Sequence, residues 1–255
     1  MQQYFAKNKN LELEDTDYHH IKNVMRMKKG DMIKVIWDKT IYDCKITKIA
    51  DKSSFDIIAK EKIKNDDYEV AVACSLIKEQ KLNYLIQKCT ELGASELIFL
   101  NTERSIIKIE DKKLSSKITR WEKICKEASE QSFRTKLPYI SGILSLNDLV
   151  KKEYDLKLFC SLNKNTKNIK KVLQKNNKCV KILLVVGPEG GFTLKEEEYL
   201  IKNGFTSVSL GKNVLRAETA AVTALSMLNY EFMRWVVWKI YLQQRLILLI
   251  TFIII

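Results

Sequence analysis

The segment KILLVVGPEGGF, residues 181–192, places an almost entirely apolar run before a loop with three of the chain's eight glycines and one of its two prolines. A continuous apolar run of this length is typical of a strand buried on both faces of a parallel sheet. A glycine-rich turn at the carboxyl end of such a strand is where open α/β sheets bind ligands, because the backbone can approach a ligand closely. The segment predicts an open α/β fold with helices on both faces of the sheet.

The hydrophobic pattern of the chain changes at about residue 70. Before it, short alternating runs from Asp31 to Ala59 predict a small antiparallel barrel or sheet, preceded by a helix that ends at Gly30. After it, strand-like runs alternate with helical stripes, and Thr193 with Glu196 forms the capping-box pattern of a helix start. We expect an N-terminal domain at 1–70 and an α/β domain at 71–233.

The positive charge is concentrated in the middle of the chain. The formal net charge is +13, and residues 71–180 carry 22 Lys+Arg against 12 Asp+Glu. Within that region, Lys151 to Lys178 holds nine lysines against Glu153 and Asp155. Such a surplus attracts a polyanion by releasing its counterions. A solvated surface in a lysine-rich composition is the alternative, and charge alone leaves both open.

Several function classes are disfavoured by composition. The six cysteines are widely spaced and form no C-x-x-C pair, which argues against a zinc site or a disulfide framework. The two histidines, His19 and His20, are adjacent, and they leave few partners for a metal site or a nucleophile–histidine pair. We expect no metal. The N-terminus MQQYFAKNKN is polar and does not read as an export signal, so we expect a cytoplasmic protein.

The glycine loop has a counterpart further along the chain. GPEGGF matches neither the dinucleotide fingerprint nor the phosphate-binding loop, so by itself it is a ligand loop or a tight structural turn. SLGKNVLRAETAAVTAL, residues 209–225, is a second strand followed by a glycine turn and a helix. Two such loops in consecutive units can form two walls of one pocket.

GPEGGF together with LGKNVLRAETA resembles the paired signatures of the SPOUT-class methyltransferases, specifically the bacterial 16S ribosomal RNA (uracil-N3)-methyltransferase family. The resemblance extends to HHIKNVMRMKKGD, QKCTELGASELIFLNTERS and WEKICKEASEQSFR, and it covers roughly residues 1–233. It implies an N-terminal RNA-binding barrel of the PUA or OB type, an α/β domain with a trefoil knot, a homodimer and S-adenosylmethionine as cofactor. The substrate implied is small-subunit ribosomal RNA, free or in the assembled subunit. The matching positions imply a cofactor pocket lined by Gly187, Glu189, Gly190, Leu210, Gly211, Val214, Leu215 and Arg216.

The implied reaction suggests roles for two residues near the end of the second motif. Uracil N3 carries a proton, so it becomes a nucleophile only when that proton leaves and the resulting anion is stabilised. We expect Arg216 to stabilise this anion, and Glu218 to accept the proton or to orient Arg216. Alternatively, Arg216 holds an RNA phosphate and Glu218 only complements the helix dipole.

Four further residues are expected to contact RNA, because they fall in the other motifs of the resemblance: His20, Arg26, Arg104 and Arg134. Arginine suits bidentate recognition of phosphates and base edges. Structural packing is the alternative for His20 and Arg26. A different function class also stays open, namely a non-catalytic RNA-binding or ribosome-assembly factor that retains the fold.

The segment 234–255 is an atypical apolar tail. It is interrupted by Lys239, Gln243, Gln244 and Arg245, and its uninterrupted apolar run from Leu246 is 10 residues long. About 20 residues are needed to span a bilayer, so we expect no transmembrane helix. Three interpretations remain: a peripheral anchor, an element that covers a dimer, or an aberrant end from a shifted reading frame, which we favour because an exposed β-branched end invites aggregation.

Overall fold

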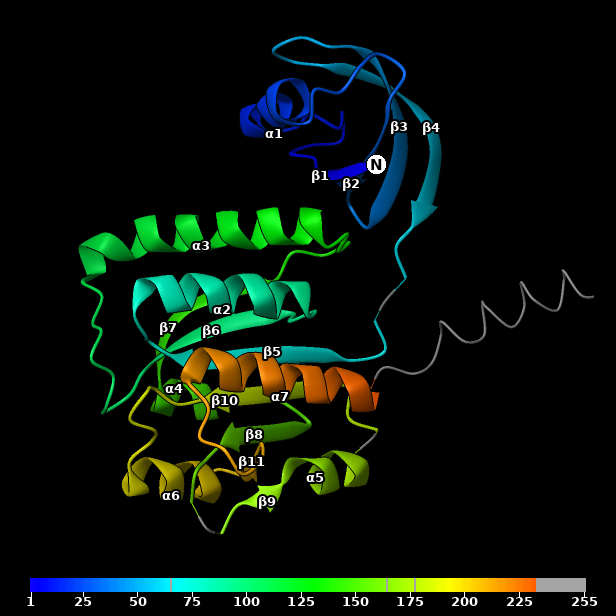
Figure 1. The fold of residues 1–255 in the computed structure, drawn as a ribbon. Helices are drawn as coiled ribbons and strands as arrows, with labels where there is room; N and C mark the ends of the chain where they lie inside the picture. The colour runs from blue at the N-terminus through cyan, green and yellow to red at the C-terminus, as the bar shows by residue number, and fades with distance from the viewer. Residues whose placement is uncertain (65, 164, 177, 233–255) are drawn as a thin grey trace, which may run out of the picture.

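The computed structural model describes residues 1–64, 66–163, 165–176 and 178–232, which form two sheets (Figure 1). The N-terminal sheet has the order β1-β2-β3-β4, with β1 parallel to β2 and the other pairs antiparallel. Its elements are β1 (Gln2–Phe5), α1 (Asp15–His19), η1 (His20–Val24), β2 (Met32–Trp37), β3 (Thr40–Lys48) and β4 (Ser54–Lys62). Tyr4, Leu13, Ile21 and Ile33 belong to its core. Of the two expected forms, a barrel or a sheet, the described strands form a curved sheet with β1 and β4 as its edges (Figure 1).

The second sheet has seven strands in the order β7-β6-β5-β10-β8-β11-β9, and every pairing in it is parallel. The strands are β5 (Glu69–Ser75), β6 (Glu96–Asn101), β7 (Tyr139–Ser145), β8 (Leu156–Cys160), β9 (Lys167–Asn168), β10 (Lys181–Val186) and β11 (Thr206–Ser209). β10 lies in the middle of the sheet and is buried from Ile182 to Val186. The apolar run therefore occupies the position that its composition predicts.

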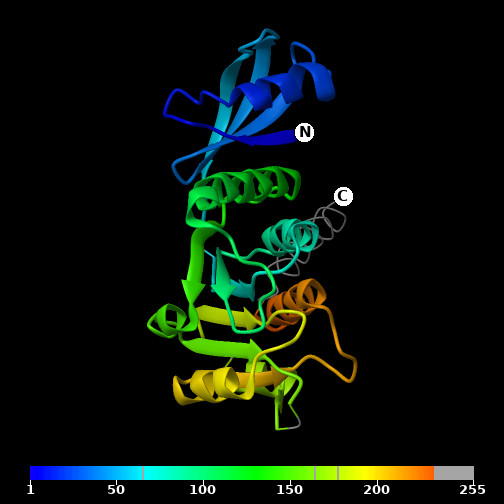
Figure 2. The ribbon, with the colours of Figure 1, turned by 90° about the vertical axis from the view of Figure 1, so that its left-hand side faces the viewer.

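Helices cover both faces of this sheet (Figures 1 and 2). They are α2 (Glu79–Glu91), α3 (Asp111–Gln131), α4 (Leu146–Val150), α5 (Ile169–Lys175), α6 (Leu194–Lys202) and α7 (Ala217–Phe232). Residues of α2, α3, α5 and α7 pack into one hydrophobic cluster, whereas α4 and α6 contribute Leu149 and Leu200 to a second cluster. The open α/β class predicted from the sequence is confirmed, and the trefoil knot, which concerns chain threading, stays a prediction.

Local signals predicted some element ends correctly and missed others. The capping box at α6 is present: Thr193 Oγ1 accepts from Glu196 N at 3.3 Å, and Glu196 Oε2 accepts from Thr193 N at 2.8 Å. The helix expected to reach Gly30 instead ends at Val24, and Arg26 adopts a positive φ of 50°. That backbone conformation is incompatible with a continuing right-handed helix.

The tail at 234–255 lies outside the described residues. Among the residues that the structure describes, no helix is long and apolar enough to cross a membrane.

A partly buried ionic cluster joins the N-terminal sheet to α3. Lys126 Nζ lies 2.6 Å from Asp17 Oδ1 and 3.2 Å from Glu130 Oε1. The backbone N of Phe5, in β1, donates to Glu130 Oε1 at 3.3 Å. Burial raises the pKa of Glu130 to about 7, against a smaller lowering effect of Lys126. The two parts of the chain are therefore held together by ion pairs and by a hydrogen bond from the backbone of β1 to α3.

Replacing Lys126 by Met is expected to lower the free energy of unfolding by about 2 kcal/mol, because it leaves Asp17 without its buried counter-ion. The cost at a fully buried pair is about 3–5 kcal/mol, and the side chain of Lys126 retains 15% exposure. Urea unfolding followed by tryptophan fluorescence measures the difference. Lys123→Met on the exposed side of α3 is the matched control, and an equal loss in both variants would contradict the role of the cluster.

Candidate active site

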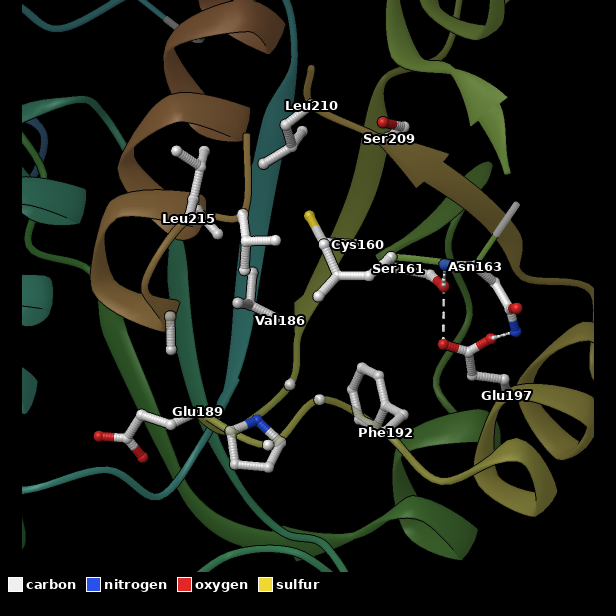
Figure 3. A pocket seen from close by; sticks show the side chains of 18 of the residues that line it. Cys160, Ser161, Asn163, Val186, Glu189, Phe192, Glu197, Ser209, Leu210 and Leu215 are labelled. Atoms are coloured by element: carbon white, nitrogen blue, oxygen red, sulfur yellow. Dashed lines mark hydrogen bonds between the residues drawn. The ribbon is translucent and has the colours of Figure 1, made fainter. Parts of the chain in front are cut away.

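Three loops meet where neighbouring strands of the large sheet end. β8 lies between β10 and β11, so the loops after Val186, Cys160 and Ser209 emerge side by side at the carboxyl edge. They enclose a cavity of about 360 Å³ (Figure 3). Its lining residues include Gly187, Glu189, Gly190, Leu210, Gly211, Val214 and Leu215. The structure thus brings together both glycine motifs of the sequence.

The first wall is the GPEGGF loop, whose small residues serve close packing. A Cβ added at Gly187 would lie 3.2 Å from two ring carbons of Phe192, which is tighter than most real Cβ contacts, so the ring would have to shift by a few tenths of an ångström. Gly191 has a φ of 68°, a conformation that glycine adopts without strain. Glu189 points away from the centre of the cavity and pairs with Lys81 at 2.9 Å, and the hydrogen bond from Lys81 lowers the pKa of Glu189 (Figure 3).

Arg104, which follows β6, holds the GPEGGF loop in place through hydrogen bonds to its backbone. Its Nη1 donates to the carbonyl oxygen of Gly190 at 2.8 Å and to that of Phe192 at 3.3 Å. Arg104 also lines the cavity. Its guanidinium therefore positions the pocket wall, while the RNA contact expected for it stays a prediction.

The second wall is the loop after β11 with the start of α7. Leu210 and Leu215 face the middle of the cavity together with Val186 (Figure 3). Arg216 is exposed and is not among the lining residues, although its neighbours Leu215 and Ala217 are.

Glu218 differs from Arg216 in being buried. It is 8% exposed, and its Oε2 has no hydrogen-bond partner. The structure shows no ion pair between Glu218 and Arg216, both of which it describes. The expectation that Glu218 orients Arg216 is therefore not supported by a contact.

The third wall consists of residues that the sequence did not single out. Ser161 Oγ donates to Glu197 Oε1 at 2.7 Å, and Asn163 Nδ2 donates to Glu197 Oε2 at 2.8 Å (Figure 3). All three line the cavity. Cys160 lies beside them, and burial raises the pKa of its thiol to about 12, so the thiol stays protonated and inert. The available signal was that the run DLKLFCSL ends here, at the same sheet edge as the glycine loops.

The remaining sequence-predicted residues lie away from the cavity. His20 Nδ1 is hydrogen-bonded to Tyr4 Oη at 2.9 Å, and Arg26 is exposed after η1. Arg134 Nη1 donates to two backbone carbonyl oxygens at the end of α2, those of Thr90 at 2.8 Å and Ala94 at 2.9 Å. For Arg134 the geometry is that of a structural residue, because it ties the carbonyl of Thr90, in the last turn of α2, to that of Ala94, in the loop before β6.

Comparison with known proteins agrees with this geometry. The family model described as RNA methyltransferase domain matches residues 64–229, and that described as RNA methyltransferase PUA domain matches residues 13–60. The ribosomal RNA small subunit methyltransferase E of Bacillus subtilis is 33% identical over 91% of this chain and 97% of its own length. The chain belongs to the ribosomal RNA small subunit methyltransferase E family. The resemblance inferred from the motifs is thereby confirmed, as is the SPOUT-like class of the parallel-sheet domain.

Solved structures of similar proteins include two with S-adenosylmethionine. A putative methyltransferase from Legionella pneumophila in complex with this cofactor has a TM-score of 0.82 and 28% identity, over 90% of this chain and 97% of its own. A ribosomal RNA small subunit methyltransferase E from Neisseria gonorrhoeae bound to the same cofactor has a TM-score of 0.81 and 24% identity, over 90% and 97%. Both of these structural relatives thus contain bound S-adenosylmethionine.

Proposed function

We propose that this chain transfers a methyl group from S-adenosylmethionine to N3 of a uridine in small-subunit ribosomal RNA. The observation that carries the proposal is the meeting of both glycine motifs around one cavity at the carboxyl ends of β10, β8 and β11. Membership of the methyltransferase E family supports ribosomal RNA methylation, and the motif VLRAET supports uracil N3 as the acceptor. An enzyme with this substrate acts in the cytoplasm, where ribosomes are.

The cavity suits the cofactor in size and in chemistry. Ligand pockets commonly enclose about 300–1,000 Å³ with mostly apolar walls and a few polar groups, and this cavity of about 360 Å³ combines Val186, Leu210 and Leu215 with exposed glycines at Gly190 and Gly211. S-adenosylmethionine supplies an electrophilic methyl group on a sulfonium when it is bound. The residues that would hold it are the seven predicted from the motifs that line the cavity, all except Arg216, largely through backbone groups, because glycine leaves the amides and carbonyls accessible.

The protein must supply a group that accepts the proton of uracil N3 and a group that stabilises the resulting negative charge. Arg216 is exposed between two lining residues, so its guanidinium is free to meet a uracil carbonyl at the mouth of the cavity. There it would stabilise the uracil anion. Glu218 follows the lining residue Ala217 on α7 and carries a buried carboxylate oxygen without a partner, and a carboxylate within reach of N3 could accept its proton. We assign the first role to Arg216 and the second, as the weaker candidate, to Glu218.

Nucleotide mapping tests the function directly. In small-subunit RNA from a strain that lacks the gene, one N3-methyluridine should be absent, and it should return when the gene is restored. Calorimetry with S-adenosylmethionine is the companion measurement. An unchanged modification pattern, together with no binding at millimolar cofactor, would show a non-catalytic RNA-binding or assembly factor.

Replacing Glu197 by alanine is expected to raise the KM for S-adenosylmethionine about tenfold, because the loop after β8 loses the carboxylate that holds Ser161 and Asn163 in place. Steady-state kinetics with each substrate varied in turn measures the effect. The KM for RNA and the kcat at saturating cofactor should change little.

Glu198→Ala is the matched control for that experiment, since Glu198 is the next residue on α6 and is exposed. Equal effects of the two substitutions would show that charge on α6, and not the contacts of Glu197, sets cofactor affinity. The double variant Ser161→Ala, Glu197→Ala should raise the KM for S-adenosylmethionine by less than the product of the two single effects. The reason is that each substitution removes the same hydrogen bond, the one between Ser161 and Glu197.

A homodimer is the proposed active unit. Three large apolar side chains at the rim of the cavity are exposed, Leu162 by 70%, Leu194 by 68% and Val214 by 75%. Exposed apolar patches of this kind mark contact surfaces. Light scattering of the purified protein measures the mass, and Val214→Asp should shift it toward the monomer.

A further inference from the structure

The lysine-rich segment at 151–178 is divided by the fold into two groups. Its first three lysines have partners inside the molecule, for example Lys152 with Glu96 at 2.5 Å. The lysines around β9 and α5 differ, because they are exposed and, among the residues that the structure describes, form no ion pair within 4.0 Å: Lys167, Lys170, Lys171, Lys175 and Lys178. Composition alone could not separate these two groups.

Three of these lysines, Lys167, Lys171 and Lys175, line a groove of about 350 Å³ between β9, α5 and β11. Lys171 and Lys175 are four residues apart on α5, so they share one face of that helix. Six of the seven residues that line it end in an ammonium, amide or hydroxyl group, although apolar side-chain carbons form most of the surface that faces the groove: Lys167, Asn168, Lys171, Lys175, Asn176 and Thr206, with Val172 as the apolar member. The chain has no acidic residue between Asp155 and Glu189, so no carboxylate in this stretch neutralises the groove.

The chemistry of the groove matches a sugar–phosphate backbone. Lysine ammonium groups are point charges on flexible stems that suit phosphates, and amide and hydroxyl groups donate to phosphate oxygens. The groove has neither arginine nor an aromatic side chain to read or stack a base. Its contacts would therefore be independent of sequence and sensitive to salt.

The position of the groove adds a constraint on length. β9 is the last strand of the large sheet, whereas the N-terminal sheet packs beyond the opposite edge, on α3 (Figures 1 and 2). Strands lie about 4.8 Å apart, so the six spacings from β7 to β9 cover roughly 29 Å. The groove and the N-terminal sheet therefore lie at opposite ends of the large sheet.

We propose that the β9–α5 groove is a second RNA-docking surface, which binds the phosphate backbone of the substrate RNA away from the methylated base. This inference rests on the proposed function for the identity of the RNA. Each phosphate that a lysine neutralises contributes about 0.7–0.9 to the slope of log affinity against log salt, so three contacts contribute about 2.

The test compares the wild type with the triple variant Lys167→Gln, Lys171→Gln and Lys175→Gln. The affinity for protein-free small-subunit RNA is measured by filter binding from about 50 to about 300 mM KCl, a range wide enough to determine the slope of log affinity against log salt. We expect at least tenfold weaker binding near 150 mM salt, a slope lower by about 2, and unchanged affinity for a short hairpin and for S-adenosylmethionine. Circular dichroism and thermal unfolding confirm that the variant is folded.

Lys112→Gln, Lys113→Gln and Lys123→Gln together are the matched control, because these exposed lysines of α3 carry the same total charge. Equal weakening by the control, or unchanged RNA affinity in the test variant, would overturn the proposal. Loss of affinity for assembled subunits but not for protein-free RNA would also overturn it, in favour of an acidic protein partner. A wild type that binds RNA through these lysines but transfers no methyl group would refute the proposed function and leave the surface standing.

Discussion

Replacing Arg216 by alanine is expected to slow methyl transfer in a single turnover about 100-fold to 1,000-fold, which is the usual cost of removing one group that stabilises a developing anion. Arg216 is exposed beside the cavity, and its guanidinium forms no ion pair with any residue that the structure describes. The expected loss falls on the chemical step, because the charge on uracil develops only as the proton leaves N3.

The measurement is rapid-quench methylation with RNA and cofactor both saturating, so that binding defects do not enter the rate. Arg216→Lys is the matched variant: it keeps the charge but not the planar donor pair, and we expect an intermediate rate. A near-normal rate in Arg216→Ala would make the assignment wrong. A rate restored by higher RNA concentration would show that Arg216 holds a phosphate instead.

Gly187→Val is expected to weaken binding of S-adenosylmethionine about 100-fold, since forcing extra methyl groups into a packed site costs about 1–3 kcal/mol. The added Cβ would meet the ring of Phe192 at 3.2 Å and the backbone N of Phe192 at 3.3 Å. The glycine loop must then move, and with it the backbone groups that line the cavity. Isothermal calorimetry measures the dissociation constant.

Two companions sharpen this prediction. Gly187→Ala should have a smaller effect in the same direction, because it adds one carbon. Combining Gly187→Ala with Phe192→Leu should recover part of the affinity, since the shorter side chain removes the ring carbons from the contact. If the double variant binds more weakly than either single one, crowding against Phe192 is not the cause.

Local signals in the chain were sufficient for the elements around the cavity. β10 is a continuous apolar run, α6 begins with its own capping box, and Gly204 with a φ of 86° follows the end of α6. β1 and β7 were not predicted. β1 is a strand of four residues that pairs with β2 about thirty residues away, and β7 contains Gly142 at a φ of 81°, so neither carries a clear periodic pattern.

The candidate site shows the same division. The cofactor-pocket residues predicted from the two motifs line the cavity, apart from Arg216, because each motif follows its own strand directly. Ser161, Asn163 and Glu197 were missed because their hydrogen bonds join segments more than thirty residues apart. Arg134 illustrates the converse, since only the fold shows that its guanidinium caps α2.

The sequence by itself determined that the chain has an apolar parallel strand, two glycine turns after strands and a lysine-rich segment, because periodicity, caps and turns are properties of neighbouring residues. Only the tertiary structure decided that β8 inserts between β10 and β11 and brings three loops around one cavity. It also decided which lysines are paired inside the fold and which surround a groove. Strand order depends on how side chains that are distant in sequence pack together, and a local sequence pattern does not contain that information.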